Sequence, residues 1–186
     1  MSEELERLYA QNVERRRALR IPGYVTLAEA GFDGEYVTPY QIASRSMTGP
    51  VLVAKDWFDA PSALENQVLL SKTGYMPGIP FNNVLDLALS HASLKRSNLY
   101  VTQAFHLLTP RRSAYIPPRH IDESFDGVTK YELEGRRVIA LGDDAYRACR
   151  RHGVECVGVI HPSARTGSYE DRARQIAKAL VGNLAV

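Results

Sequence analysis

The sequence predicts an α/β fold, a three-layer α/β/α sandwich with a central four-stranded, mostly parallel sheet. Four short apolar runs, rich in β-branched residues, alternate with segments of helical periodicity. Each run is too short for a typical helix and is apolar on both faces, as buried parallel strands are. Strands that alternate with helices favour a sheet covered by helices on both sides. The runs cover residues 51–54, 99–102, 138–141 and 157–160.

The expected helices follow from apolar spacing and from residues that begin or end helices. An amphipathic, charged segment at the start of the chain stops at Ile21-Pro22-Gly23. Asn82 is the expected N-cap of a second helix, and Gly142 opens another that Gly153 ends. Segments 24–50 and 59–80 are expected to be irregular, the latter around a short helical stretch. The predicted helices cover residues 3–20, 82–91, 121–132 (weakly), 142–152 and 169–181.

The length of 186 residues fits one domain, 1–186, because it allows one sizeable core. Residues 1–45 form an N-terminal helix and an irregular extension. No apolar run approaches the roughly 20 residues that span a membrane. The first six residues are acidic and lack an apolar stretch behind them, so they do not resemble a secretory signal. We therefore expect a cytoplasmic protein without membrane association.

The formal net charge of +2 does not by itself mark a nucleic-acid-binding protein. The arginines are clustered, however, and clustered arginine can follow a phosphate backbone. Solvated helix faces and salt bridges are the commoner explanation of any one cluster. The clusters include Arg15-Arg16-Arg17, Arg111-Arg112, Arg136-Arg137 and Arg150-Arg151.

Neither a metal nor a cofactor is expected. Cys149 and Cys156 are the only cysteines, too few for a four-cysteine cluster, and both are expected to be free, inert thiols. The widely spaced His91, His106, His120 and His161 form no recognised ligand pattern. No glycine-rich dinucleotide or phosphate-binding motif is present, and Ser163 lacks the surroundings of a hydrolase nucleophile.

Polar clusters follow each of the four predicted strands. They are Lys55-Asp56-Trp57-Phe58, Gln103-Ala104-Phe105-His106, Gly142-Asp143-Asp144 and His161-Pro162-Ser163. In an open α/β sheet, ligands bind beyond the carboxyl ends of the strands. We therefore expect these clusters to converge on one rim. An acid, an amide, a histidine and aromatic rings gathered there predict an active site.

These motifs, in this order, resemble the uracil-DNA glycosylase superfamily over residues 48–182. The resemblance is carried by the four post-strand clusters together with Gly78-Ile79-Pro80-Phe81-Asn82, which precedes a predicted helix. The first 45 residues have no counterpart in it. The resemblance implies a monofunctional enzyme that flips a pyrimidine out of DNA, cleaves its N-glycosidic bond and leaves an abasic site.

The resemblance also implies a role for each site residue. Asp56 matches the acid that orients the attacking water and offsets the positive charge of the sugar. His161 matches the donor that stabilises negative charge on the departing base. Phe81 matches the ring that stacks on the flipped base. Ser163 matches a phosphate contact, and Arg165 stands where the superfamily inserts a side chain into the vacated stack.

The residues that depart from the superfamily pattern are at positions expected to lie near the flipped base. Gln103 replaces the usual asparagine and is expected to read the base edge with the same amide, one methylene further out. Lys55 replaces a glutamine and is expected to contact a phosphate, a base substituent or the catalytic acid. Phe58 matches the aromatic ring that bars a 5-methyl group, and Trp57 replaces the proline expected before it.

Uracil and a modified pyrimidine, including a hypermodified cytosine of phage DNA, therefore stay open as substrates. The first would indicate DNA repair and the second antiphage defence. The expected partner is DNA, and we expect a monomer. Two other functions stay open: a catalytically idle DNA-binding protein of the same fold, and an α/β enzyme that acts on free nucleosides or nucleotides.

Overall fold

A four-stranded parallel sheet forms the centre of the protein, as the sequence predicts. The computed structural model describes residues 3–182, and its strand order is β2-β1-β3-β4 with every neighbouring pair parallel. The strands are β1 (Val51–Ala54), β2 (Tyr100–Gln103), β3 (Val138–Leu141) and β4 (Cys156–Val159). The bounds of β2 and β4 differ from the prediction by one residue.

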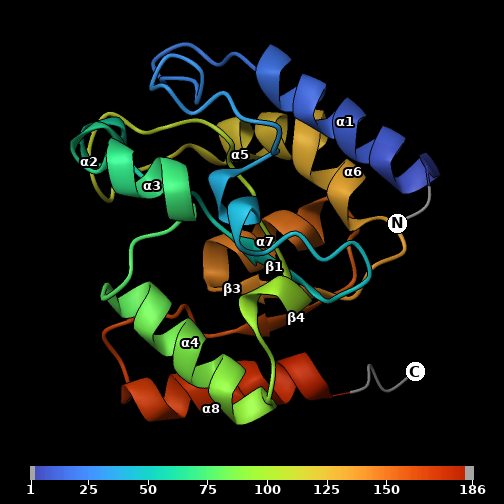
Figure 1. Ribbon diagram of the computed structural model, residues 1–186, viewed down its shortest axis with the longest axis vertical. Coiled ribbons are helices and arrows are strands. Elements are labelled where there is room, and N and C mark those ends of the chain that lie inside the picture. The colour runs from blue at the N-terminus through green and yellow to red at the C-terminus, as the bar shows by residue number, and fades with distance from the viewer. Residues whose placement is uncertain (1–2, 183–186) are drawn as a thin grey trace.

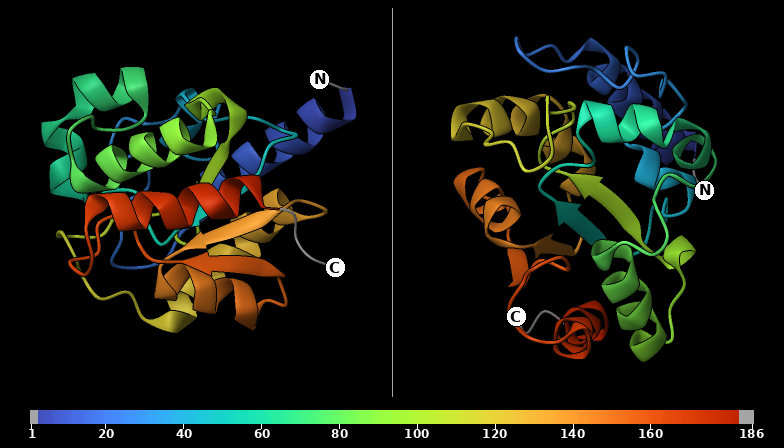
Figure 2. Two further views of the ribbon diagram at one scale, coloured as in Figure 1. Left: turned by 90° about the horizontal axis from the view of Figure 1, so that it is seen from below. Right: turned by 90° about the vertical axis from the view of Figure 1, so that its left-hand side faces the viewer.

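Helices cover both faces of the sheet, which confirms the three-layer α/β/α architecture (Figure 1). Figure 2 shows α8 on one side of the sheet and α7 on the other. The first face carries α2 (Ala60–Glu65), α3 (Gln67–Thr73), α4 (Pro80–Ala92) and α8 (Tyr169–Val181). The second carries α1 (Glu3–Ala18), α5 (Pro118–Ser124), the π-helical turn η3 (Phe125–Thr129), α6 (Lys130–Leu133) and α7 (Asp143–Arg151).

The expected burial of the strands on both faces is confirmed for three of the four. Every residue of β1, β2 and β3 is buried. The edge strand β4 is different, because Gly158 is exposed and Cys156 is only half-buried. Cys156, the first residue of β4, therefore lies at the edge of the sheet and not in its core. Cys156 and Cys149 are both free thiols.

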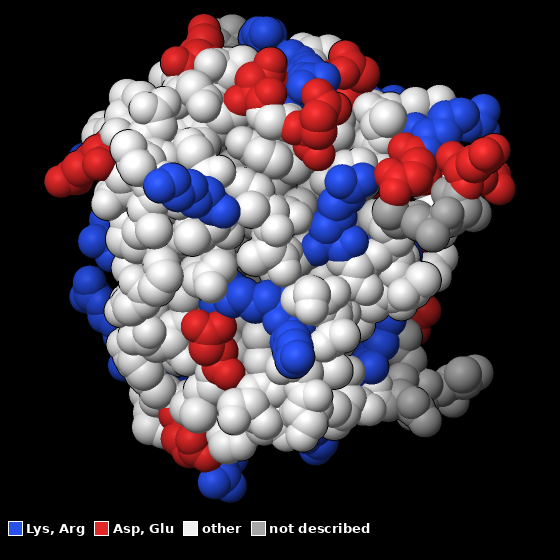
Figure 3. Space-filling model, in the orientation of Figure 1, with Lys and Arg blue, Asp and Glu red and all other residues white. Residues whose placement is uncertain are grey.

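The segment before β1 is irregular, as expected, but it is packed into the protein. It contains the short 3₁₀ helix η1 (Pro39–Ile42), and Leu27, Phe32 and Tyr40 within it are buried against the first face. Arg16 of α1 is also buried and donates to Asp33 and to two carbonyl oxygens. Along α1, acidic and basic side chains lie side by side (Figure 3). Ion pairs thus account for much of the arginine cluster in this helix.

Two helical predictions need correction. Helix α4 begins at Pro80, with Ile79 as its N-cap, so Asn82 lies inside the helix instead of capping it. The fixed φ of proline favours the first helical position, while the buried Asn82 amide donates to the carbonyl of Met76. The weak helix expected over 121–132 is longer, running from Pro118 to Leu133 through α5, η3 and α6. A second 3₁₀ helix, η2 (Arg96–Asn98), precedes β2.

Candidate active site

A cleft of about 1170 Å³ opens at the carboxyl ends of β1, β3 and β4. Its walls come from the segments after these strands, from the start of α4 and α8, and from the loop after β2. The cleft brings together eight of the nine residues that the sequence singled out. They are Lys55, Asp56, Trp57, Phe58, Phe81, His161, Ser163 and Arg165.

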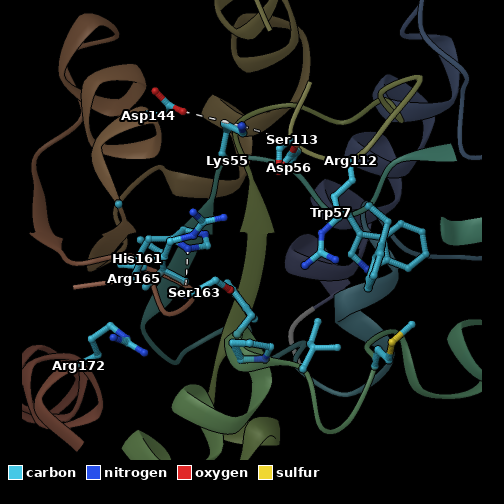
Figure 4. Close-up of a pocket in the computed structure, with 18 of the residues that line it drawn as sticks. Lys55, Asp56, Trp57, Arg112, Ser113, Asp144, His161, Ser163, Arg165 and Arg172 are labelled. Carbon is cyan, nitrogen blue, oxygen red and sulfur yellow. Dashed lines mark hydrogen bonds and ion pairs between the residues drawn. The ribbon is translucent and has the colours of Figure 1, made fainter. Parts of the chain in front are cut away.

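Lys55 lies between two carboxylates in this cleft (Figure 4). Its Nζ atom is 4.0 Å from Asp56 Oδ2 and 3.9 Å from Asp144 Oδ2. Asp56 is half-buried, and burial raises the pKa of its carboxyl, whereas the charge of Lys55 acts in the opposite direction and Asp144 reinforces the rise. Lys55 therefore favours the ionised form of Asp56.

His161 is held in one neutral tautomer by the turn that follows it. The backbone N–H of Ser163 donates to His161 Nδ1 at 3.1 Å. A neutral imidazole that accepts at Nδ1 carries its proton on Nε2. Burial lowers the pKa of His161, and the nearby Lys55 charge lowers it further. The site thus contains a neutral imidazole whose Nε2–H is a hydrogen-bond donor.

Gly142 allows the end of β3 to approach His161 closely. Its φ is +89°, and a Cβ atom built on it would lie 2.9 Å from His161 Cβ. Any side chain at this position would displace the histidine or the backbone, because real Cβ contacts are not that short. Gly142 also forms the N-cap of α7, as the sequence predicts.

The aromatic side chains of the cleft are packed more tightly than the sequence suggested. Phe81 is only 6% exposed, with its ring stacked on Tyr40 at 5.9 Å and tilted toward His161 at 5.7 Å. Trp57 is buried and donates from its indole nitrogen to the carbonyl of Gly74. Phe58 is half-buried and packs edge-on against Trp57. These rings form the apolar floor of the cleft.

Gln103 does not reach the cleft, which corrects its expected position at the rim. It is 1% exposed, and its Oε1 accepts a hydrogen bond from the Thr38 hydroxyl at 2.8 Å. The segment before β1 therefore covers the end of β2. The other residues of this cluster are also buried, and His106 lies beside Glu132, with His106 Nε2 3.5 Å from Glu132 Oε2. The polar cluster after β2 is thus part of the interior and not of the rim.

Several cleft residues were not identified from the sequence as members of the site. Tyr40 contributes part of the floor, and Arg112, Arg147 and Tyr169 line the opening. Arg112 belongs to the loop after β2, a segment without helical or strand periodicity. No sequence pattern indicated that this loop would cross to the ends of the other strands.

The fold and the cleft define a three-layer α/β/α protein with a candidate site at the carboxyl ends of its strands. The chain matches no protein-family model and no curated protein sequence. Within residues 3–182, no three or more histidine, cysteine or acidic side chains cluster as metal ligands would. In the same range, no helix has both the length and the apolar character needed to cross a membrane.

Proposed function

We propose that this protein is a DNA glycosylase that hydrolyses the N-glycosidic bond of a pyrimidine flipped into the cleft. The observation that carries the proposal is the presence of two complementary groups in one cleft. Asp56 is a half-buried carboxylate next to Lys55, and His161 is a neutral imidazole with its proton on Nε2. Hydrolysis of an N-glycosidic bond uses a carboxylate that activates water and a hydrogen-bond donor that stabilises the departing nucleobase.

In the proposed reaction, the bond between sugar C1′ and the base nitrogen breaks, and its electron pair leaves with the base. The Nε2–H of His161 donates to the base oxygen on which negative charge develops. Because that charge is largest in the transition state, one such donor can lower the barrier by about 3 kcal/mol. Asp56 offsets the positive charge on the sugar, orients the water that attacks C1′ and accepts its proton. The departing base anion takes up one proton from water and Asp56 returns the proton it accepted, so that the products are a neutral free base and an abasic site.

In this proposal the flipped base lies on the aromatic floor of the cleft. Phe81 and Phe58 offer apolar surface, although Phe81 is mostly covered by its neighbours. The burial of Gln103 removes the side chain expected to read the base edge. The proposal therefore includes uracil and modified pyrimidines alike, with repair or antiphage defence as the corresponding roles. DNA is the proposed partner, bound by a monomer.

Base release from a panel of oligonucleotides tests this function. The panel contains uracil, 5-hydroxymethyluracil, thymine, and plain, hydroxymethylated and glucosylated cytosine, each in single- and double-stranded DNA. We expect release of at least one base, and a loss of about 100-fold or more in Asp56→Asn. Asp126→Asn is the matched control, because Asp126 is an exposed carboxylate outside the cleft.

Release of no base with DNA binding intact would contradict the proposal and favour a catalytically idle DNA-binding protein. Release from free nucleosides but not from oligonucleotides would instead indicate an enzyme of nucleoside metabolism. Full activity of Asp56→Asn would exclude the role given to this carboxylate.

A further inference from the structure

Three arginines at the opening of the cleft have no partner within the part of the chain that the structure describes. Arg112, Arg147 and Arg165 are exposed and line the cleft, yet they form no hydrogen bond or ion pair within residues 3–182. Other arginines are used internally: Arg137 donates to two carbonyl oxygens of α8, and Arg172 to three in the loop after β4. The three guanidinium groups at the cleft are therefore available to a ligand.

The three arginines come from different walls of the cleft. Arg112 belongs to the loop after β2, Arg147 to α7 and Arg165 to the loop after β4. Figure 4 shows Arg112 and Arg165 on opposite sides of the opening, with His161 nearer to Arg165. A polyanion that contacts both walls must pass between them, across the catalytic groups. A ligand that lies on one flat surface would reach only one side.

An exposed aromatic ring accompanies these charges. Tyr169, the first residue of α8, lines the cleft and is 43% exposed. The guanidinium of Arg172 lies 5.0 Å from the centre of its ring. Arg172 is itself 4% exposed and is held by the carbonyl oxygens of Pro162, Thr166 and Gly167. The ring therefore rests on a buried cation that is anchored to the loop carrying Arg165.

We infer that the opening of the cleft binds a single nucleic-acid strand. Its phosphates contact Arg112 on one wall and Arg147 and Arg165 on the others, and a base next to the flipped nucleotide stacks on Tyr169. Unpaired arginines beside an exposed aromatic ring are the groups that bind unpaired strands. The exposed carboxylates of Asp143 and Asp144 also line the cleft, so the phosphates are expected to follow the arginines and not the whole opening. Bases within a duplex are already stacked and cannot lie on Tyr169. The inference rests on the proposed function for the identity of the flipped nucleotide, and it adds a preference for single-stranded substrate.

Equilibrium binding tests this inference without requiring base release. The protein is used as the full chain carrying Asp56→Asn, with fluorescent thymine oligonucleotides, single-stranded or annealed to their complement. We expect tighter binding to the single strand than to the duplex. Tyr169→Ala should weaken single-strand binding by about 5- to 150-fold, the range for loss of one base–aromatic stack.

Each arginine variant should also lower the salt dependence of binding. A plot of log affinity against log salt has a negative slope. For Arg112→Gln and Arg147→Gln this slope should become shallower by about 0.7, the value for one phosphate contact with a single strand. Arg111→Gln and Arg150→Gln are matched controls, because they are exposed arginines on the same loop and helix but outside the cleft. Tyr115→Ala is the control for Tyr169, since Tyr115 is 78% exposed and also lies outside the cleft.

Tighter binding to the duplex, or equal losses in the cleft variants and their controls, would overturn the inference. Failure of the proposed function would give a different result. The protein would bind the single strand with the expected losses in the variants, but it would release no base from any oligonucleotide. Conversely, base release with unchanged affinity in the Arg112, Arg147 and Tyr169 variants would leave the glycosylase function standing and refute the single-strand groove.

Discussion

The backbone N–H of Ser163 donates to His161 Nδ1 at 3.1 Å and thereby fixes which imidazole nitrogen carries the proton. The donor is a main-chain group of the same turn, so no other side chain is needed to orient the histidine. A protonated imidazole would place an N–H at Nδ1, facing the N–H of Ser163. The turn therefore disfavours protonation in addition to the effect of burial.

We predict that more than half of His161 is neutral, in the Nε2–H form, at pH 6.5. Burial lowers its pKa below the ordinary 6.5, and heteronuclear NMR of the imidazole nitrogens distinguishes the two tautomers and the cation. Because the folded-state pKa lies below the unfolded one, the contribution of His161 to stability is complete above pH 6.5 and is lost as pH falls through the folded-state pKa. A cationic His161 spectrum at pH 6.5 would contradict this assignment.

Lys55 and Asp144 should shift the acid limb of the pH–rate profile in opposite directions. Burial raises the pKa of Asp56, Lys55 lowers it and Asp144 raises it. Loss of Lys55 in Lys55→Gln should therefore move the acid limb to higher pH, and Asp144→Asn should move it to lower pH. Lys130→Gln, which removes an exposed lysine outside the cleft, should leave the profile unchanged. Shifts in the same direction for both cleft variants would show that another group governs this limb.

We predict that Gln103 contributes to stability and not to base preference. Its Oε1 accepts from the buried Thr38 hydroxyl, and the side chain lies outside the cleft. Gln103→Leu leaves that hydroxyl without its partner but also removes the buried Gln103 Nε2, which has no hydrogen-bond partner within the described residues. It should therefore lower the free energy of unfolding by less than the about 1–3 kcal/mol that one unpaired buried group costs. Denaturant unfolding measures this loss, and competition between two released bases measures preference. A change in base preference of about tenfold or more would contradict the prediction and show that the Gln103 amide contacts the base during the reaction.

The parts of the fold set by local sequence were predictable. The four strands could be recognised because buried parallel strands need continuous apolar runs, and α8 because its segment has helical apolar spacing. The position of Gln103 was not predictable, since its burial depends on Thr38, which is distant in sequence and lies in an irregular segment. The same reason applies to Arg112 and Tyr169, whose place at the cleft is decided by the packing of loops. Local pattern locates strand ends, whereas long-range contacts decide which side chains reach the cleft.

The close approach of Gly142 to His161 leads to a prediction with an internal control. Gly142 has φ +89°, Gly153 has φ +69°, and both conformations are strained for any other residue. A Cβ atom at Gly142 would lie 2.9 Å from His161 Cβ, whereas one at Gly153 would meet nothing within 4 Å. Both glycines flank α7 and have positive φ, but only Gly142 has a neighbour where its Cβ atom would lie.

Gly142→Ala and Gly153→Ala should each lower the free energy of unfolding by about 1–3 kcal/mol, through backbone strain. Only Gly142→Ala should also impair base release, because it alone displaces His161, and misplacement of a catalytic group by about 1 Å can cost about 100-fold. Thermal unfolding and single-turnover base release, measured at a temperature where both variants are folded, separate the two effects. Equal activity in the two variants would mean that the position of His161 does not depend on this contact. Equally low base release by Gly142→Ala and Gly153→Ala would mean that the loss of activity comes from destabilisation and not from displacement of His161.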